Sequence, residues 1–255
     1  MGEKKEKVSA VSSVDKAIDI LVALGQSDNK TIRELGHQLE ITKSTLHRIL
    51  QTLENRGLVK KNNTTDKYSL GYKILELSSH LKIHNEIRDL ALKHMEELRD
   101  LIGDTVQLAI LEKDEIIIIE TVEGTNNLRF FAQPGQKYPI TYGNFGKVFL
   151  AYQPTSSVLN HIKENPLVKY ASSSITDHDQ FIKQVNEVRN DKISVSIDDP
   201  IEGAVSIAVP IVNTNGHIEA SLAIAGVKTQ QKMDNIDQLK VIIKEYADKI
   251  SNEFK

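Results

Sequence analysis

Residues 31–70 constrain the fold of this chain more than any other stretch; they read TIRELGHQLEITKSTLHRILQTLENRGLVKKNNTTDKYSL. Thr31 and Glu34 have the spacing of a capping box, which predicts the start of a helix. A second amphipathic helix is predicted to begin after Thr42, its N-cap, and a charged hairpin follows Gly57. A helix, a tight turn, a second helix and a hairpin, in this order, predict a winged helix-turn-helix, which docks on duplex DNA.

The second predicted helix has one apolar and one polar face. The apolar stripe consists of Leu46, Ile49, Leu50 and Leu53, which lie in one arc at 3.6 residues per turn. The opposite side is polar and net basic, and residues near the N-terminus of such a helix reach base edges or phosphates in the major groove. We therefore expect contacts with DNA from Lys43, Ser44, Thr45, His47 and Arg48, with Ser44, Thr45 and Arg48 as the principal ones.

The hairpin that follows this helix is rich in lysine. Gly57 predicts a left-handed end to the helix, and the segments 58–61 and 67–70 predict two short strands around a polar turn. We expect Lys60, Lys61 and Lys67 to meet the phosphate backbone. A polar helix face or a charged hairpin tip is ordinary by itself, so the prediction rests on the whole ordered set of features.

Charge is divided unevenly along the 255 residues, although the net charge is only −3. Residues 1–82 hold 14 basic against 10 acidic side chains, whereas residues 83–255 hold 18 against 25. This asymmetry is expected if only the first part meets phosphates. Cysteine is absent, which excludes disulfides and thiolate chemistry, and the charged N-terminus has no apolar signal region, so we expect a cytoplasmic protein without a membrane span.

The second half changes to a mixture of strands and helices. Helices are expected over about 13–25, 71–81, 84–102, 144–152, 155–163, 177–190 and 234–254. Strands are expected over 105–111, 115–122, 128–132, 192–197, 203–212 and 217–227, the last two joined by a hairpin turn at Asn213–Gly216. About six strands with helices segregated around them predict an α+β domain.

At this point the chain resembles the IclR family of bacterial transcriptional regulators along nearly its full length. The matching segments are SVDKAIDIL, ITKSTLHRILQTLENRGLV, YSLGYKILEL, PGQKYPITYGNFGKVFLAY and GAVSIAVPIVNTNGHIEASLAIAG. The resemblance implies a winged helix-turn-helix domain over 1–70, a linker helix over 71–83 that is used in dimerisation, and a GAF-like effector-binding domain over 84–255.

The resemblance also implies a pocket for a small effector, commonly a carboxylate, an aromatic acid or a sugar-derived acid. Carried over by position, its residues would be Asn144, Phe145, Ser196 or its neighbours Asp198 and Asp199, Ser206, Ala223 and Ala225. Alanines stand at 223 and 225, where carboxylate-binding members can offer serine hydroxyls, and Phe145 is bulky where a small residue is usual. A buried carboxylate needs several donors, so a less polar or differently oriented ligand fits this chain.

Other chemistry is less well supported by the residues. Gly143–Lys147 is too short for a phosphate-binding GxxxxGK[ST] loop and is interpreted as a helix start with a packing role. His80 and His84 lack the further ligands of a metal site, Asp177 is interpreted as a helix cap, and Asp198 and Asp199 either line the pocket or form a solvated turn. No catalytic triad is recognisable, so we expect neither enzyme activity nor a cofactor or metal.

We thus predict a homodimeric or homotetrameric regulator that binds a double-stranded operator and a small organic effector, an acid or a sugar-derived molecule. We expect it to be a repressor of a catabolic operon rather than an activator. Two alternatives remain open at this stage. One is a metabolite-binding enzyme with an appended helix-turn-helix, and the other is a DNA-architectural protein whose second domain is purely structural.

Overall fold

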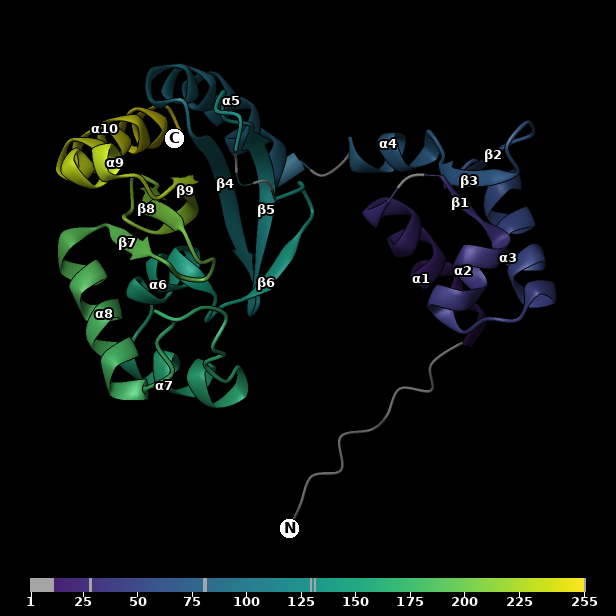
Figure 1. The fold of residues 1–255 in the computed structure, drawn as a ribbon, viewed down its shortest axis with the longest axis horizontal. Coiled ribbons are helices and arrows are strands. Elements are labelled where there is room, and N and C mark those ends of the chain that lie inside the picture. The colour runs from purple at the N-terminus through teal and green to yellow at the C-terminus, as the bar shows by residue number, and fades with distance from the viewer. Residues whose placement is uncertain (1–11, 28, 80–81, 129, 131, 255) are drawn as a thin grey trace, which may run out of the picture. The chain divides into compact units, whose positions relative to one another are not determined.

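The computed structural model describes residues 12–27, 29–79, 82–128, 130 and 132–254, and it divides into two compact units at Lys82 and Ile83 (Figure 1). None of the helices in the described ranges is long and apolar enough to cross a membrane.

The first unit is a small three-stranded sheet packed on helices. Its elements are α1 (Ser12–Gln26), β1 (Lys30–Thr31), α2 (Ile32–Leu39), α3 (Lys43–Asn55), β2 (Val59–Asn62), β3 (Lys67–Leu70) and α4 (Lys73–Ser78). The strands are antiparallel in the order β1-β3-β2, and β2 and β3 form the predicted hairpin. The core is apolar and fully buried, with Ile20, Leu24, Leu35, Leu46 and Leu50 at its centre.

The ends of α2 and α3 follow the sequence signals closely. Thr31 and Glu34 form the predicted capping box at the start of α2. Gly57 has a φ of 72°, and the amides of Gly57 and Leu58 donate to the carbonyls of Glu54 and Leu53, which is the Schellman pattern for ending a helix. Thr42 is the N-cap of α3 as predicted, although its side chain makes no bond to a first-turn amide.

The second unit is a three-layer α+β domain. Its elements are α5 (Lys82–Ile102), β4 (Thr105–Glu112), β5 (Glu115–Val122), β6 (Lys137–Pro139), α6 (Gly143–Ala151), α7 (Thr155–Glu164), α8 (His178–Asp191), β7 (Ser194–Ile197), β8 (Ala204–Val212), β9 (Ile218–Val227), α9 (Gln230–Asp234) and α10 (Ile236–Glu253). The six strands form one antiparallel sheet in the order β6-β5-β4-β9-β8-β7.

Helices cover both faces of this sheet (Figure 1). One face packs against α5 and α10 through a continuous cluster of large aliphatic side chains, including Leu108, Ile207, Leu222 and Ile243. The other face packs against α6, behind which lie α7 and α8, and there the strands contribute mainly small side chains such as Ala109, Ala208 and Ala223. Because strand side chains alternate between faces, neighbouring residues of one strand belong to different cores.

One predicted strand is wrong. Of the segment 128–132, the described residues 128, 130 and 132 are not in a strand, and the edge strand beside β5 is β6 instead. Backbone groups of the turn before β6 also pair with β5, since Gly135 donates to the carbonyl of Ile118 and the Ile118 amide donates to Gln136. Phe130 and Ala132 of this loop face a cavity, whereas Leu128 is 69 % exposed.

Three helix boundaries also differ from the predictions. The helix expected over 71–81 is the short α4, the one expected from residue 84 begins at Lys82 as α5, and the closing helix is divided into α9 and α10 around Asn235. Gly146 confirms the packing role predicted for the start of α6, because a Cβ there would lie 2.1 Å from the carbonyl oxygen of Ile140. Asp177 caps α8, as expected, by accepting from the Gln180 amide at 2.9 Å.

Candidate functional site

The first candidate surface is the polar face of α3. Leu46, Leu50 and Leu53 are buried in the small core, which turns the opposite side of the helix to solvent. On that side, Lys43, Ser44, His47 and Arg48 are exposed, while Thr45 is half-buried. The Thr42 hydroxyl donates to the Thr45 hydroxyl at 3.0 Å, so the Thr45 oxygen is held in place while its own proton remains available to a phosphate or base.

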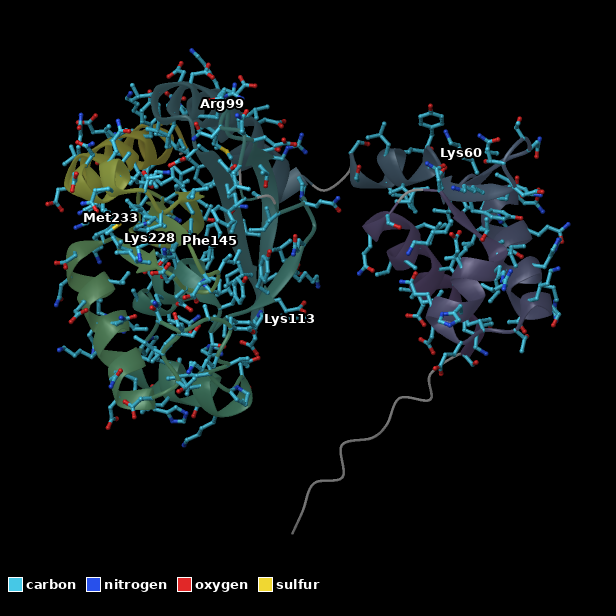
Figure 2. The ribbon with its side chains drawn as sticks, in the orientation of Figure 1. Lys60, Arg99, Lys113, Phe145, Lys228 and Met233 are labelled. Carbon is cyan, nitrogen blue, oxygen red and sulfur yellow. The ribbon has the colours of Figure 1, made fainter. Side chains whose placement is uncertain are left out.

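The lysines of the β2-β3 hairpin differ from one another in their surroundings. Lys60 is exposed, and its ammonium lies 5.6 Å from the centre of the Tyr72 ring (Figure 2). Lys61 is paired with Asp66 across the hairpin at 2.6 Å, and the hydrogen bond to that carboxylate raises the pKa of Lys61. Lys67 is half-buried in β3. Lys60 is therefore the freest of the three, whereas a phosphate must compete with Asp66 for Lys61.

A hollow of about 510 Å³ separates the hairpin from the starts of α2 and α3. Its lining brings together Lys43 and Lys61, two residues predicted to contact DNA, with Arg33, which was not predicted. Arg33 is exposed two residues after the N-cap Thr31, where the helix N-terminus also attracts anions. The signal in the sequence was its place in the first turn of the capped helix.

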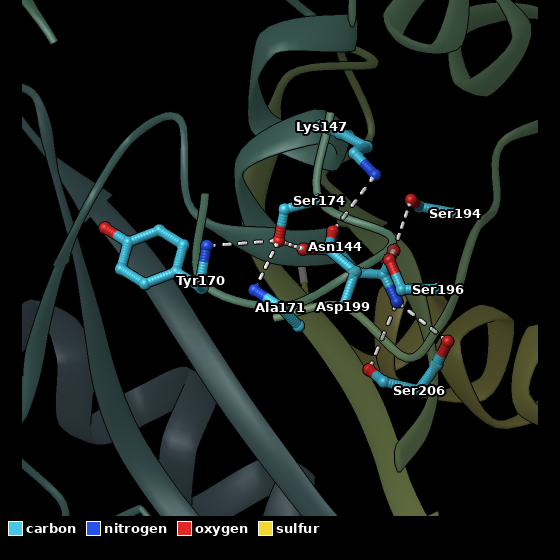
Figure 3. Close-up of polar contacts among 9 residues, drawn as sticks. All are labelled: Asn144, Lys147, Tyr170, Ala171, Ser174, Ser194, Ser196, Asp199 and Ser206. Carbon is cyan, nitrogen blue, oxygen red and sulfur yellow. Dashed lines mark hydrogen bonds and ion pairs between the residues drawn. The ribbon is translucent and has the colours of Figure 1, made fainter. Parts of the chain in front are cut away.

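The second candidate site lies between α6 and the small-residue face of the six-stranded sheet. Asn144 is 4 % exposed and connects the two strands β7 and β8 to α6 (Figure 3). Its amide nitrogen donates to the Ser206 carbonyl at 2.7 Å and to the Ser206 hydroxyl at 3.1 Å, while its oxygen accepts from Ser194 and Ser196, each at 2.7 Å. Because all the hydrogen-bonding groups of this amide are engaged, Asn144 fixes α6 on the sheet.

A cavity of about 130 Å³ opens beside this network. Five of the residues considered for the effector pocket line it, namely Asn144, Phe145, Asp199, Ser206 and Ala225. Ser196, Ala223 and Asp198 are not in the lining. Ser196 is bonded to Asn144, Ala223 is buried in the core, and Asp198 binds Lys228 and the Gly203 amide.

Residues that were not assigned to the pocket complete the cavity wall, and they come from β4, the loop before β6, β6 itself and the loops around α6 and before β8. They are Gln107, Phe130, Ala132, Tyr138, Tyr142, Gly143, Pro200, Ile201 and Ala204. The Tyr138 and Tyr142 rings are stacked, with centroids 4.3 Å apart. Burial raises the pKa of Tyr142 to about 12 and raises that of Tyr138, so both phenols keep their protons near neutral pH.

A buried lysine stands on the far side of Asp199 from this cavity. Lys147 is 5 % exposed, burial lowers its pKa, and its ammonium lies 3.9 Å from the Asp199 carboxylate (Figure 3). The other Asp199 oxygen accepts from the Ser174 hydroxyl, which in turn accepts from the amides of Tyr170 and Ala171. Asp199 thus lines the cavity, with Lys147 near one carboxylate oxygen and the 170–174 turn holding the other.

Metal ligation finds little support in the described ranges, where no group of three or more His, Asp or Glu side chains is placed to hold an ion. The side chains of His80 and His84, considered above as a metal pair, lie outside the described residues.

Family models match both units. The model described as IclR helix-turn-helix domain matches residues 13–63, and the model described as Bacterial transcriptional regulator IclR C-terminal matches residues 80–252. Among curated proteins, the HTH-type transcriptional regulator KdgR of Dickeya chrysanthemi is 29 % identical over 244 residues, which cover 96 % of this chain and 80 % of the relative.

Solved structures of similar chains have the same architecture. A transcriptional regulator of the same family from Alicyclobacillus acidocaldarius is 27 % identical, with a TM-score of 0.80 over 95 % of this chain and 98 % of its own. An IclR homologue from Microbacterium hydrocarbonoxydans, solved with 4-hydroxybenzoate, also has a TM-score of 0.80, over 94 % of this chain and 98 % of its own, at 20 % identity.

Proposed function

The chain belongs to the IclR family of bacterial transcriptional regulators, and we propose that it is a dimeric repressor whose affinity for its operator is controlled by a small effector. DNA binding and regulation, rather than enzyme activity, are properties of the family. The repressor role, the effector and the assembly are the parts that we propose. We further assign residues 1–70 to the DNA-binding domain, 71–83 to the linker and 84–255 to the effector domain, and place the protein in the cytoplasm with the chromosome.

The exposed face of α3 carries the proposal. Ser44 and Arg48 project from the N-terminal half of a helix whose other side is locked into the core, and Lys61 of the hairpin shares a hollow with Lys43 at the start of this helix. In a winged helix-turn-helix, this is the helix that enters the major groove, while the hairpin follows the backbone. Arginine at such a position reads guanine bidentately, and lysine supplies salt-dependent affinity without sequence preference.

A second copy of the chain is the partner that we propose for the exposed apolar residues of the first unit. Val14, Ile18 and Val22 form an i, i+4, i+8 stripe on α1, and each is 53 % exposed. Tyr72, the N-cap of α4, is 81 % exposed, and Leu75 within α4 is 68 % exposed. Burying these side chains in an isologous interface would hold two recognition helices at a fixed spacing, as a near-palindromic operator requires.

The cavity beside α6 is the proposed effector site. It is enclosed by aromatic and small apolar side chains with a few polar groups, which is the usual character of a small-molecule site. The structural relative that was solved with 4-hydroxybenzoate supports a one-ring organic ligand in a domain of this fold. An effector can shift DNA affinity only through its preference for one arrangement of the dimer, typically by about 1–3 kcal/mol.

Replacing Arg48 tests the DNA-binding assignment. Arg48→Ala should weaken binding to an operator selected in vitro from random duplexes by about 1–3 kcal/mol and relax base preference, because a base-reading fork is lost. Fluorescence anisotropy at fixed salt measures the affinity. Lys93→Ala is the control, since it removes an equally exposed positive charge from the other unit. Equal affinities for the two variants would contradict the proposed role of α3.

A further inference from the structure

Gln107 is a buried side chain whose amide makes no hydrogen bond to the residues that the structure describes. It lies on β4 opposite Ala223 of β9, is 9 % exposed, and lines the cavity beside α6. None of the described residues donates to or accepts from its amide. The amide is not among the fully enclosed polar groups that lack a partner, so it reaches the cavity with its hydrogen-bonding groups available to a ligand.

Asp199 gives the cavity its charge. It is the one carboxylate among the lining side chains that the structure describes, and no lysine or arginine stands among them. The nearest ammonium, that of Lys147, approaches Asp199 from a separate hollow that is also lined by Ser174 and Tyr170. A ligand in the cavity therefore meets an acceptor that favours hydroxyl or amide donors and repels a second carboxylate.

The size and walls of the cavity limit the ligand further. Its volume of about 130 Å³ is close to that of engineered protein cavities of about 150 Å³, which hold a benzene ring. Four aromatic rings line it, those of Phe130, Tyr138, Tyr142 and Phe145. Aromatic walls bind planar rings through offset stacking and edge contacts.

We propose that the effector is an uncharged single-ring molecule bearing hydroxyl or amide groups, which is bound by Gln107 and Asp199 and selected against the corresponding carboxylic acid. This inference rests on the proposed function, because it specifies the ligand of the proposed effector cavity. Gln107 can donate to and accept from the ligand, while Asp199 can accept from one of its hydroxyl or amide donors. The Ser206 hydroxyl, whose oxygen accepts from Asn144, retains a proton for a further ligand oxygen.

Two nearly isosteric probes separate charge from shape: 4-hydroxybenzamide is neutral and 4-hydroxybenzoate is an anion. Calorimetric titration of the full chain should give tighter binding of the amide by about tenfold or more, because the acid is placed beside Asp199. Asp199→Asn should remove most of this difference. Asp198→Asn is the matched control, since that carboxylate is adjacent in sequence but binds Lys228 outside the cavity.

Gln107 is tested with the same two probes. Gln107→Leu, with Gln107→Met as a second variant of similar volume, should weaken binding of the amide by about five- to tenfold through loss of a buried hydrogen bond. Tighter binding of the acid in the wild type, no binding of either probe, or an unchanged affinity in the Gln107 variants would overturn the inference.

Operator binding without any probe keeps the two proposals apart. If the wild-type protein binds its selected operator but fails the probe tests, only the ligand class is wrong. If it binds no duplex selectively, the proposed function itself fails, whatever the probes do.

Discussion

The two faces of the six-stranded sheet are built from the same strands but have different roles in the domain. On the face toward α5 and α10, β4, β8 and β9 present residues such as Leu108, Ile207 and Leu222, all fully buried. On the face toward α6, the adjacent positions are Ala109, Ala208 and Ala223. The large side chains of the first face fill the space beside the sheet. The side chains of β4, β8 and β9 on the second face are small, so α6 can approach the sheet closely and a cavity remains beside it.

Polar groups follow the same division. Gln107, Ser206 and Ser196 all belong to the α6 face, together with the Asn144 amide that connects β7 and β8 to the helix. Polar groups in a core are tolerated where they are mutually satisfied and otherwise cost stability. The contrast teaches that β4, β8 and β9 fill one face with their own aliphatic side chains, and that the other face holds the polar groups that a ligand can use.

The largest expected effect comes from the aliphatic face. Leu222→Ala should lower the free energy of unfolding by about 2–5 kcal/mol, because it removes a fully buried side chain and leaves a hole in a close-packed cluster. Urea denaturation of the full chain, followed by circular dichroism, measures the loss. A change below about 1 kcal/mol would mean that Leu222 is not held in a close-packed cluster.

The second largest loss of stability is expected when the hydrogen-bond network of Asn144 is removed. Asn144→Ala removes the amide that satisfies the Ser194 and Ser196 hydroxyls, so we expect a loss of about 1–3 kcal/mol in the same denaturation experiment. Ligand binding should weaken as well, because α6 forms one wall of the cavity. Unchanged stability would show that water replaces the amide and that the network is not what holds α6.

Lys147 should affect the pH dependence of the free energy of unfolding. Burial lowers its pKa in the folded protein, so between that value and the usual 10.5 the unfolded chain binds more protons and folding becomes more favourable as pH rises. Lys147→Met lacks this contribution. The stability of the wild type relative to the variant should therefore increase from pH 7 to pH 10, and parallel pH profiles would contradict the assignment.

The smallest effect is expected on the face with the cavity. Ala225→Ser adds one hydroxyl where the side chain is only half-buried and faces open space, so the free energy of unfolding should change by less than about 0.5 kcal/mol. Affinity for 4-hydroxybenzoate should improve, since the new hydroxyl can donate to a carboxylate. A loss of stability as large as that of Leu222→Ala would erase the contrast between the two faces.

Local signals predicted much of the fold. The capping box of Thr31 and Glu34, the glycine end of α3 and the alternating pattern of β8 and β9 each depend on residues close together in sequence, and the structure contains all of them. The segment 128–132 shows the limit of such signals. Its alternation resembled a strand, but the edge of the sheet is completed by Lys137–Pro139, and Pro139 is acceptable there because an edge strand needs fewer donors.

The candidate sites divide in the same way. The exposed face of α3 could be located from helical periodicity alone, since the positions that build the core also determine which residues are left outside. By contrast, the cavity joins Gln107 of β4, Asn144 of α6, Asp199 of a loop and Ala225 of β9, which are far apart along the chain. The Asp66 carboxylate that occupies Lys61 could likewise be seen only in the folded hairpin.

The sequence by itself determined the helix-turn-helix, the order of the elements and the sign of charge on each half, because these follow from short-range spacing and composition. Only the tertiary structure decided which polar side chains are engaged in hydrogen bonds within the protein and which remain available to a ligand. Asn144 is saturated by serines from β7 and β8 while Gln107 has no partner among the described residues, and that difference depends on strand pairing and helix packing that bring distant segments together.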